Sequence, residues 1–435
     1  MMRYIHKAIK YGKEHGKKAL IKKIIAVLTL QNKVVSSVDD NCVEGANPND
    51  IHKLSNLWDV RFNQLRPLKV FYSKQNLEKR INLITDSINS SSLFGGVITA
   101  IIYTFFLAKK NNAVVRIITR TEFAEEYRIK DILDHYEIKF DNDISFIFAH
   151  VLDINKEIDV VDGDYFVTTS WWTTYSTMQS IQNNKILYLL QEDERMFYPY
   201  GDDRLLCAET LANSEIKFII NSKLLYDHLL STGLSNISSK GCYFEPAFDA
   251  KNYFWDKNKN NEKKKLFFYA RPNNTRNLFY RGANVIQLAV NRGIIDLNIW
   301  DIYFVGKDLP KELELDNSYK IKVVTDLTYT QYGDFVRQVD LGLCLMYTPH
   351  PSYPPLDLAA SGAVVVTNIC GNKHDLKIYS DNIISVGMDV ESLLVGLQDG
   401  VQLVNNQQQR ETNYKNNKLL TNWEQSFADV LEQLG

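Results

Sequence analysis

Residues 341–368 read LGLCLMYTPHPSYPPLDLAASGAVVVTN. The apolar run Leu341–Met346 predicts a strand, and a loop with four prolines follows it. A helix is predicted to begin near Pro355, since proline suits the first turn of a helix. The β-branched run Ala363–Thr367 predicts a second strand. Strand, loop, helix and strand in this order are typical of a βαβ unit in a parallel sheet.

The same alternation extends on both sides of this segment. A charged stretch, Asp256–Lys265, interrupts it and is predicted to be an inter-domain linker. The pattern therefore predicts an α/β protein with two Rossmann-like domains and a cleft between them, in which ligands bind at the carboxyl ends of the strands. Further strands are predicted at Ile81–Thr85, Ala113–Ile118, Ile144–Ala149, Tyr165–Thr168, Ile186–Leu190, Ile216–Ile220, Leu266–Tyr269, Ile302–Val305 and Ile321–Val324, and helices at Leu93–Ala108, Gly282–Asn291, Tyr329–Val339 and Lys418–Leu434.

The expected domain boundaries follow from this pattern. Residues 1–67 are expected to form a basic extension and an irregular lead-in, and residues 68–250 the N-terminal Rossmann-like domain. Residues 264–417 are expected to form the C-terminal Rossmann-like domain. The predicted helix at 418–434 is expected to join the N-terminal domain.

Composition excludes several classes of protein. The 435 residues carry a net charge of −2, which does not indicate nucleic acid as a partner. The five cysteines are scattered without a Cys-x-x-Cys pair, so reduced thiols in a cytoplasmic protein are expected rather than a zinc site. We expect no metal.

The N-terminus concentrates positive charge. Residues 1–33 contain nine Lys or Arg residues and one acidic residue, Glu14. Their apolar run is too short to span a membrane. One interpretation is a basic amphipathic segment that contacts anionic lipid at the inner membrane face. The other is a solvated basic helix that packs on the body of the protein.

Three loops carry candidate ligand-binding groups. Gly95 and Gly96 follow a predicted strand and open an apolar helix, where backbone amides favour an anion. The alternative is that the glycines only permit a tight junction. Arg271 and Arg276 follow the first strand of the second domain and can converge on one diphosphate. The alternative is a pair of ordinary surface arginines.

The proline-rich loop is the third candidate. The amides of Ser352 and Tyr353 are expected to face a phosphate, and Asp357 to accept hydrogen bonds from ribose hydroxyls. The alternative for Asp357 is a carboxylate that stabilises the helix dipole, by roughly 0.3–1 kcal/mol.

Together these elements resemble glycosyltransferase family 4. That family has Gly-Arg-x4-Lys after the first strand of its C-terminal domain, and here Ala270-Arg271 is followed by four residues and Arg276. It also has Glu-x7-Glu, and Asp357 matches the second carboxylate. The first falls on Pro349, and its neighbour His350 is a candidate substitute. Asn368, after the following strand, completes the expected donor site.

The loop from His350 to Pro355 is similar to one in bacterial rhamnosyltransferases that build surface glycans. The resemblance implies a retaining, metal-independent hexosyltransferase that uses dTDP-L-rhamnose, with no cofactor besides this nucleotide-sugar. Arg271 and Arg276 would stabilise the leaving diphosphate. The implied acceptor is an oligosaccharide or lipid-linked glycan, as in lipopolysaccharide O-antigen. The alternative is a non-catalytic, degenerate transferase that binds glycans or assists assembly.

Candidate acceptor groups follow two strands of the first domain. Trp171 and Trp172 come after one strand, and Gln191 and Asp193 come after the next. The alternatives are core packing for the tryptophans and a solvated loop for the acidic run. Asp193 is the expected catalytic carboxylate.

Overall fold

The computed structural model describes residues 54–74, 78–89, 95–257, 259 and 261–434. The basic segment 1–33 lies outside the described residues. The chain divides into two compact units, Met1–Asn63 and Gln64–Gly435, and the first contributes helix α3 (Leu54–Arg61). No helix among the described residues has the length and apolar character needed to cross a membrane.

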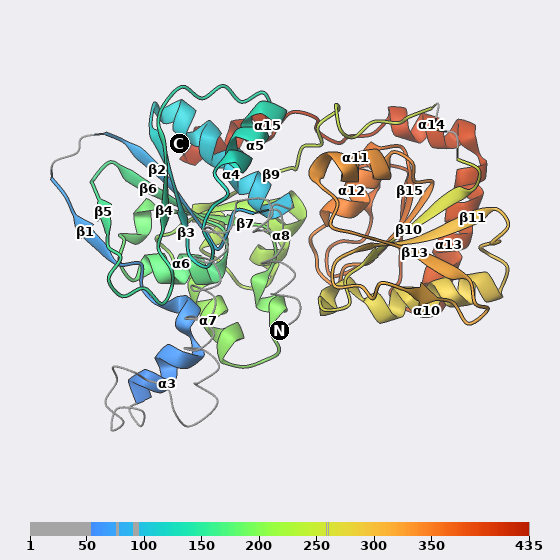
Figure 1. Cartoon of the computed structure of the whole chain (residues 1–435), viewed down its shortest axis with the longest axis horizontal. Coiled ribbons are helices and arrows are strands. Elements are labelled where there is room, and N and C mark those ends of the chain that lie inside the picture. Colours follow the sequence, from blue (N-terminus) through green and yellow to red (C-terminus); the bar gives the residue numbers. More distant parts are fainter. Residues whose placement is uncertain (1–53, 75–77, 90–94, 258, 260, 435) are drawn as a thin grey trace, which may run out of the picture. The chain divides into compact units, whose positions relative to one another are not determined.

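The first sheet of the larger unit has seven strands, all paired in parallel, within the described residues (Figure 1). Strands β2 and β7 are buried along their whole length, as expected of a parallel sheet covered on both faces. Successive strands are added toward one edge of the sheet from β2 to β4 and toward the other edge from β6 onward. The point between β2 and β6 is therefore a topological switch point. In spatial order the strands are β4 (Ile144–Phe148), β3 (Val114–Thr119), β2 (Arg80–Thr85), β6 (Asp164–Thr168), β7 (Ile186–Leu190), β8 (Lys217–Asn221) and β9 (Gly241–Phe244).

Apolar residues of helices α4 (Gly95–Asn111), α5 (Tyr127–His135) and α15 (Trp423–Leu434) join one core cluster with this sheet. The ring of Phe427 on α15 lies 4.8 Å from that of Phe244 on β9 and 5.3 Å from that of Tyr103 on α4. The end of the chain therefore packs on the first sheet.

The second sheet also has seven strands within the described residues, and its edge strand β12 is antiparallel. From β13 onward the order is that of doubly wound dinucleotide-binding folds, with a switch point between β10 and β14. In spatial order the strands are β12 (Leu313–Glu314), β13 (Lys320–Thr325), β11 (Trp300–Gly306), β10 (Lys264–Ala270), β14 (Leu341–Cys344), β15 (Val364–Asn368) and β16 (Ile383–Val386).

Helices cover both faces of the second sheet (Figure 1), and a core cluster lies on each face. Leu266, Phe268 and Ala270 of β10 pack with helices α10 (Phe279–Asn291) and α13 (Val390–Asn405). Phe267, between them in sequence, joins the opposite cluster with α11 (Tyr329–Val336) and α12 (Tyr353–Ala360). Successive side chains of a strand point to opposite faces, which explains this division.

Smaller elements complete the described structure. Strands β1 and β5 form a separate parallel pair. Their bounds and those of the remaining helices are β1 (Val70–Tyr72), β5 (Ile158–Val160), α6 (Trp171–Met178), α7 (Asp202–Leu211), α8 (Lys223–Ser231), α9 (Ile237–Lys240) and α14 (Gln407–Lys415), with short 3-10 turns η2 (Asn63–Leu65), η3 (Asn183–Lys185), η4 (Glu194–Phe197), η5 (Thr275–Asn277) and η6 (Leu376–Ile378).

The predicted α/β class with two Rossmann-like sheets is confirmed. Several predicted boundaries are wrong by a few residues. The predicted linker includes Lys264 and Lys265, yet these begin β10, because they pair in register with Trp300 and Asp301 of β11. The strand expected to reach Met346 ends at Cys344, where its pairing with β15 stops.

Candidate functional site

Five polar side chains meet where strands of both sheets end. We call them the polar cluster: Glu192, Arg276, Thr348, His350 and Lys373. Glu192 follows β7 of the first sheet, and Arg276 lies on η5 after β10. Thr348 and His350 follow β14, and Lys373 follows β15. The last four therefore gather beside the switch point of the second sheet, where ligands of doubly wound folds bind.

The polar cluster carries a surplus of positive charge. Arg276 Nη1 donates to Glu192 Oε2 at 3.0 Å, and its guanidinium lies 4.1 Å from the centre of the Phe197 ring. Lys373 is 1% exposed, and its Nζ donates to the carbonyl of Met346 at 3.0 Å. Burial lowers the pKa of Lys373 to about 8, so the ammonium is still charged at neutral pH. Two cations thus share one carboxylate in a buried setting, which favours a further anion.

Glu192 is itself in an unfavourable environment for a charge. Burial raises its pKa, and Arg276, Thr348 and Lys373 oppose the rise. These neighbours favour its ionised form.

His350 is a buried, neutral hydrogen-bond donor. Burial lowers its pKa to about 3, and the charges of Lys373 and Arg276 add to this effect. Its Nδ1 accepts a hydrogen bond from the Ser352 amide at 3.0 Å, so the ring proton resides on Nε2. Among the described residues, His350 Nε2 has no hydrogen-bond partner.

Two more atoms of the polar cluster share this property. Glu192 and Thr348 are buried close to each other, and neither Glu192 Oε1 nor Thr348 Oγ1 makes a hydrogen bond of good geometry in the part of the chain that the structure describes. An unsatisfied buried polar group costs about 1–3 kcal/mol. Three such atoms in one cluster indicate a ligand site, since a bound polar molecule would satisfy them.

The N-terminus of α12 offers fewer amides than the sequence suggested. Ser352 has φ 69°, a strained conformation for a residue other than glycine, and its amide donates to His350. The next helical positions include Pro354 and Pro355, which have no N–H. The expectation that the Ser352 amide faces a phosphate is therefore wrong in this structure, because His350 occupies that amide.

Tyr353 acts instead through its side chain. Its hydroxyl lies 2.8 Å from Thr99 Oγ1 of α4 and accepts from Asn221 Nδ2 of β8, also at 2.8 Å. A Cβ added at Gly95 would lie 2.9 Å from Tyr353 Cδ2. The glycine therefore makes room for this ring.

Gly96 has a similar relation to Gln191. A Cβ there would lie 3.2 Å from Gln191 Nε2, which donates to the Gly96 carbonyl. The structure thus gives both glycines a packing reason. Their contact with a donor stays a prediction, as does the acceptor role of Gln191.

Arg271 lies near Arg276, and both are half-buried. Its Nη1 donates to Tyr269 Oη at 3.4 Å. Burial lowers the pKa of Arg276, and the nearby charge of Arg271 adds to the decrease. Two guanidiniums thus lie after β10, and their joint contact with a diphosphate stays a prediction.

Asp357 and Asn368 are occupied by the protein. Tyr332 Oη donates to Asp357 Oδ2 at 3.2 Å, and burial raises the pKa of Asp357 to about 8. Asn368 accepts from the amide of Met346 at 2.7 Å and donates to its carbonyl at 3.0 Å, which joins the ends of β14 and β15. Their predicted donor contacts would add to these roles.

The predicted acceptor plate requires a correction. Trp171 is fully buried, and its indole N–H donates to Tyr198 Oη at 2.9 Å. Its face packs in the core, so it offers no surface to an acceptor. Trp172 is half-buried and donates to Asp86 at 3.0 Å, and its acceptor role stays a prediction.

Asp193 is held by neighbours outside the polar cluster. It accepts from Arg195 Nε at 2.8 Å, and its Oδ2 lies 2.9 Å from His228 Nε2. Burial alone would raise its pKa, but the hydrogen bonds from His228 and Arg195 lower it to about 2. The carboxylate that faces Arg276 is that of Glu192, one residue earlier.

Sequence reasoning placed the acidic run that contains Glu192 at a strand end but favoured Asp193, and it gave no role to Thr348 or Lys373. All three come shortly after a predicted strand, so a survey of every polar residue at strand ends would have included them. Lys373 lies outside every motif that was recognised in the sequence, so no motif indicated it.

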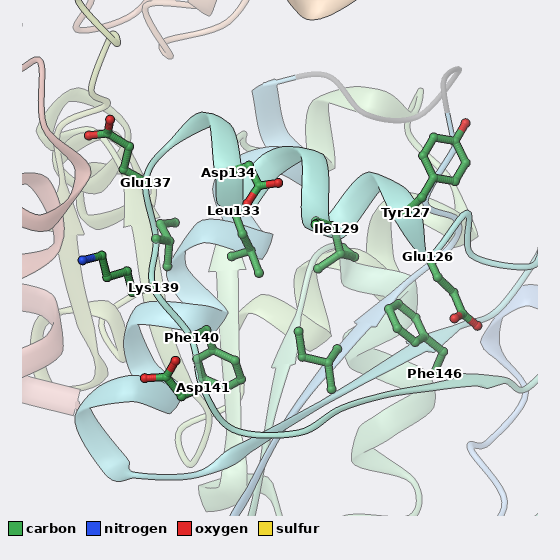
Figure 2. A pocket seen from close by; sticks show the side chains of 13 residues that line it. Glu126, Tyr127, Ile129, Leu133, Asp134, Glu137, Lys139, Phe140, Asp141 and Phe146 are labelled. Carbon is green, nitrogen blue, oxygen red and sulfur yellow. The ribbon is translucent and has the colours of Figure 1, made fainter.

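A surface groove of about 1130 Å³ lies elsewhere, beside α5 and β4 (Figure 2). Its lining mixes apolar side chains such as Phe146 with charged ones such as Asp141 and Lys139. None of the five residues of the polar cluster lines it.

Both halves of the chain match models of one family. Residues 80–223 match the N-terminal domain of WsaF, and residues 264–398 match its C-terminal domain. The chain belongs to the WsaF family of GT-B glycosyltransferases. The two matches include Glu192, Arg276, His350 and Lys373, so the polar cluster lies within the family's two domains.

Among curated proteins, O-antigen biosynthesis protein RfbC of Myxococcus xanthus is 28% identical over 276 residues. This alignment covers 62% of the chain but only 20% of RfbC, so the chain spans about a fifth of that relative.

Solved structures agree on the fold. Anabaena HepE in complex with UDP and glucose has a TM-score of 0.55 at 12% identity and covers 82% of this chain and 100% of its own. WaaG, a glycosyltransferase involved in lipopolysaccharide biosynthesis, has a TM-score of 0.52 at 11% identity, and the match covers 81% of this chain and 99% of WaaG. Sucrose-phosphate synthase from Thermosynechococcus elongatus has a TM-score of 0.52 at 12% identity, and the match covers 82% of this chain and 99% of the synthase chain.

Proposed function

We propose that this chain transfers a sugar from a nucleotide-sugar donor to a growing bacterial surface polysaccharide, with retention of configuration and without a metal ion. The proposed donor is dTDP-L-rhamnose. The observation that carries the proposal is a pair of cations, the buried Lys373 and the partly buried Arg276, beside the carboxylate of Glu192. Such a pair is suited to the diphosphate of a nucleotide-sugar.

Charge development on the leaving diphosphate explains the chemistry. As the glycosidic bond to the diphosphate breaks, negative charge grows on the leaving oxygen. Arg271, Arg276 and Lys373 provide positive charge, and the Nε2–H of His350 provides a neutral donor. In a site that excludes water, these groups stabilise the charge more strongly than they would in solution. The acceptor hydroxyl would attack from the face that the diphosphate leaves.

The place of this reaction in the cell is part of the same proposal. The similarity to RfbC, named for O-antigen biosynthesis, supports a surface glycan as the product. The acceptor would be an oligosaccharide or lipid-linked glycan at the cytoplasmic face of the inner membrane. The basic residues 1–33 would attract the anionic surface on which such an acceptor lies.

Nucleotide binding is the first test. A thermal-shift series with dTDP, UDP, GDP and ADP is run in EDTA, and stabilisation follows RT ln(1 + [L]/Kd), about 2.7 kcal/mol at a hundredfold excess over Kd. We expect a shift with dTDP. A shift with UDP or GDP instead would replace the rhamnose donor, and no shift with any nucleotide would contradict a donor site. Loss of wild-type turnover in EDTA would contradict metal independence.

A degenerate, non-catalytic transferase is the second candidate. Pro349 occupies the position of the first Glu in the Glu-x7-Glu motif of glycosyltransferase family 4, and the loss of this carboxylate favours the degenerate candidate. The buried Lys373 and the partly buried Arg276 are costly to keep without a ligand, which favours the enzyme. Nucleotide binding without sugar transfer or donor hydrolysis would support the degenerate form.

A further inference from the structure

We propose that Glu192 binds the sugar ring of the donor, and that its carboxylate accepts hydrogen bonds from ring hydroxyls. This inference rests on the proposed function and assigns to Glu192 a part in choosing the sugar. The first sheet would then recognise the sugar, while the second sheet holds the diphosphate.

The two carboxylate oxygens of Glu192 differ in their hydrogen bonding. Its Oε2 accepts from Arg276 at 3.0 Å. Its Oε1 is buried with the Thr348 hydroxyl nearby, and it accepts no hydrogen bond of good geometry among the residues that the structure describes. A carboxylate oxygen can only accept, so the missing partner is a donor.

A sugar hydroxyl meets this need, and a phosphate does not. An ionised phosphate presents acceptors, which suit the cations and His350 Nε2–H but repel Glu192 Oε1. A hydroxyl both donates and accepts, so neighbouring ring hydroxyls can donate to Glu192 and accept from Thr348 or His350. All three unpartnered atoms are then satisfied by a diphosphate that carries a polyhydroxy ring.

The local sequence supports the same assignment. The loop after β14 has Pro349, Pro351, Pro354 and Pro355 and contains no carboxylate before Asp357. Asp357 is engaged by Tyr332. Glu192 is consequently the carboxylate that lies in the polar cluster.

A purely structural role is the competing explanation. If Glu192 only pairs with Arg276, its replacement alters free nucleotide and nucleotide-sugar binding by the same factor. If Glu192 binds the sugar, its replacement weakens only the nucleotide-sugar. In that second case dTDP binds with unchanged or higher affinity, because the replacement releases Arg276 from its ion pair with Glu192.

Calorimetry on the full chain separates these explanations. The Kd of dTDP and of dTDP-L-rhamnose is measured in EDTA at pH 7 for wild type, Glu192→Gln and Glu194→Gln. Should the thermal-shift series favour UDP or GDP, UDP with UDP-glucose or GDP with GDP-mannose replaces the pair. Glu194 is the matched control, because burial raises its pKa to about 8 and the neutral carboxyl resembles glutamine.

We expect Glu192→Gln to lower the ratio Kd(dTDP)/Kd(dTDP-L-rhamnose) about tenfold, equivalent to 1.4 kcal/mol, and Glu194→Gln to preserve it. An equal change for both ligands, or none, would overturn the role of Glu192 and leave the donor site standing. No binding by wild type to any nucleotide would overturn both. If Glu192→Gln fails to fold, Glu192→Asp tests the same ratio, since it keeps the charge but withdraws the oxygens.

Discussion

Lys373 connects donor binding to pH. The residue is 1% exposed, and burial lowers the pKa of its ammonium from 10.5 to about 8. This difference corresponds to about 3 kcal/mol, which is the cost of keeping the charge buried without a ligand. A bound diphosphate would raise the pKa again, because an adjacent negative charge favours the ammonium.

Nucleotide affinity is therefore expected to decrease at high pH. Below pH 8 the lysine is charged before binding, and above pH 8 each binding event must take up a proton. We expect dTDP to bind about tenfold more weakly at pH 9 than at pH 7. The diphosphate does not titrate in this range, since its last pKa is about 6.

Two variants identify the group responsible. Lys373→Met removes the titration and should bind dTDP weakly with a flatter pH dependence, while Lys373→Arg keeps a charge across the range and should also be flat. Calorimetry from pH 7 to 9 measures all three proteins. The comparison is needed because the pKa values of Asp357 and Glu194 are also about 8. An unchanged slope in Lys373→Met would refute the reasoning.

The same lysine has a predicted effect on folding. A group with a lowered pKa in the folded state binds fewer protons there than in the unfolded chain. Stability therefore rises with pH between about 8 and 10.5. Lys373→Met should be at least as stable as wild type at pH 7, which urea denaturation measures, and a large loss would contradict the assigned desolvation cost.

Three further substitutions test separate parts of the structure. Arg271→Ala should reduce kcat/KM about a hundredfold with an unchanged melting temperature, and near-normal turnover would remove Arg271 from the diphosphate site. Tyr353→Phe should lower stability by about 1–2 kcal/mol in urea denaturation, because Thr99 and Asn221 each lose one hydrogen bond; an unchanged midpoint would contradict this contact. Gly306→Ala should cost about 1–3 kcal/mol or more by the same assay, because its Cβ would lie 1.9 Å from the Ala270 carbonyl oxygen; wild-type stability would show that β10 and β11 can separate freely.

Most of the fold could be predicted from the sequence. Apolar runs alternate with amphipathic helices along the chain, and a parallel sheet buried on both faces requires this pattern. The strand Ile186–Leu190 was predicted with the observed bounds. The separate pair of short strands β1 and β5 was missed, because a strand of three residues shows too little periodicity to be recognised.

The candidate site could be predicted only as a set of loops. Local sequence places a residue at the carboxyl end of a strand, which was sufficient to indicate Arg276 and His350. It does not determine the direction of the next side chain, because that depends on the surrounding packing. Asp193 turns toward Arg195 and His228, and its neighbour Glu192 meets Arg276.

The tertiary structure alone brought Lys373 and Glu192 together. They are far apart in the chain and belong to different sheets, so no spacing between them is visible in the sequence. It likewise decided that Trp171 packs in the core while Trp172 remains partly exposed. Periodicity is a local property that the sequence determines by itself, whereas the convergence of charges depends on how two independently patterned sheets pack.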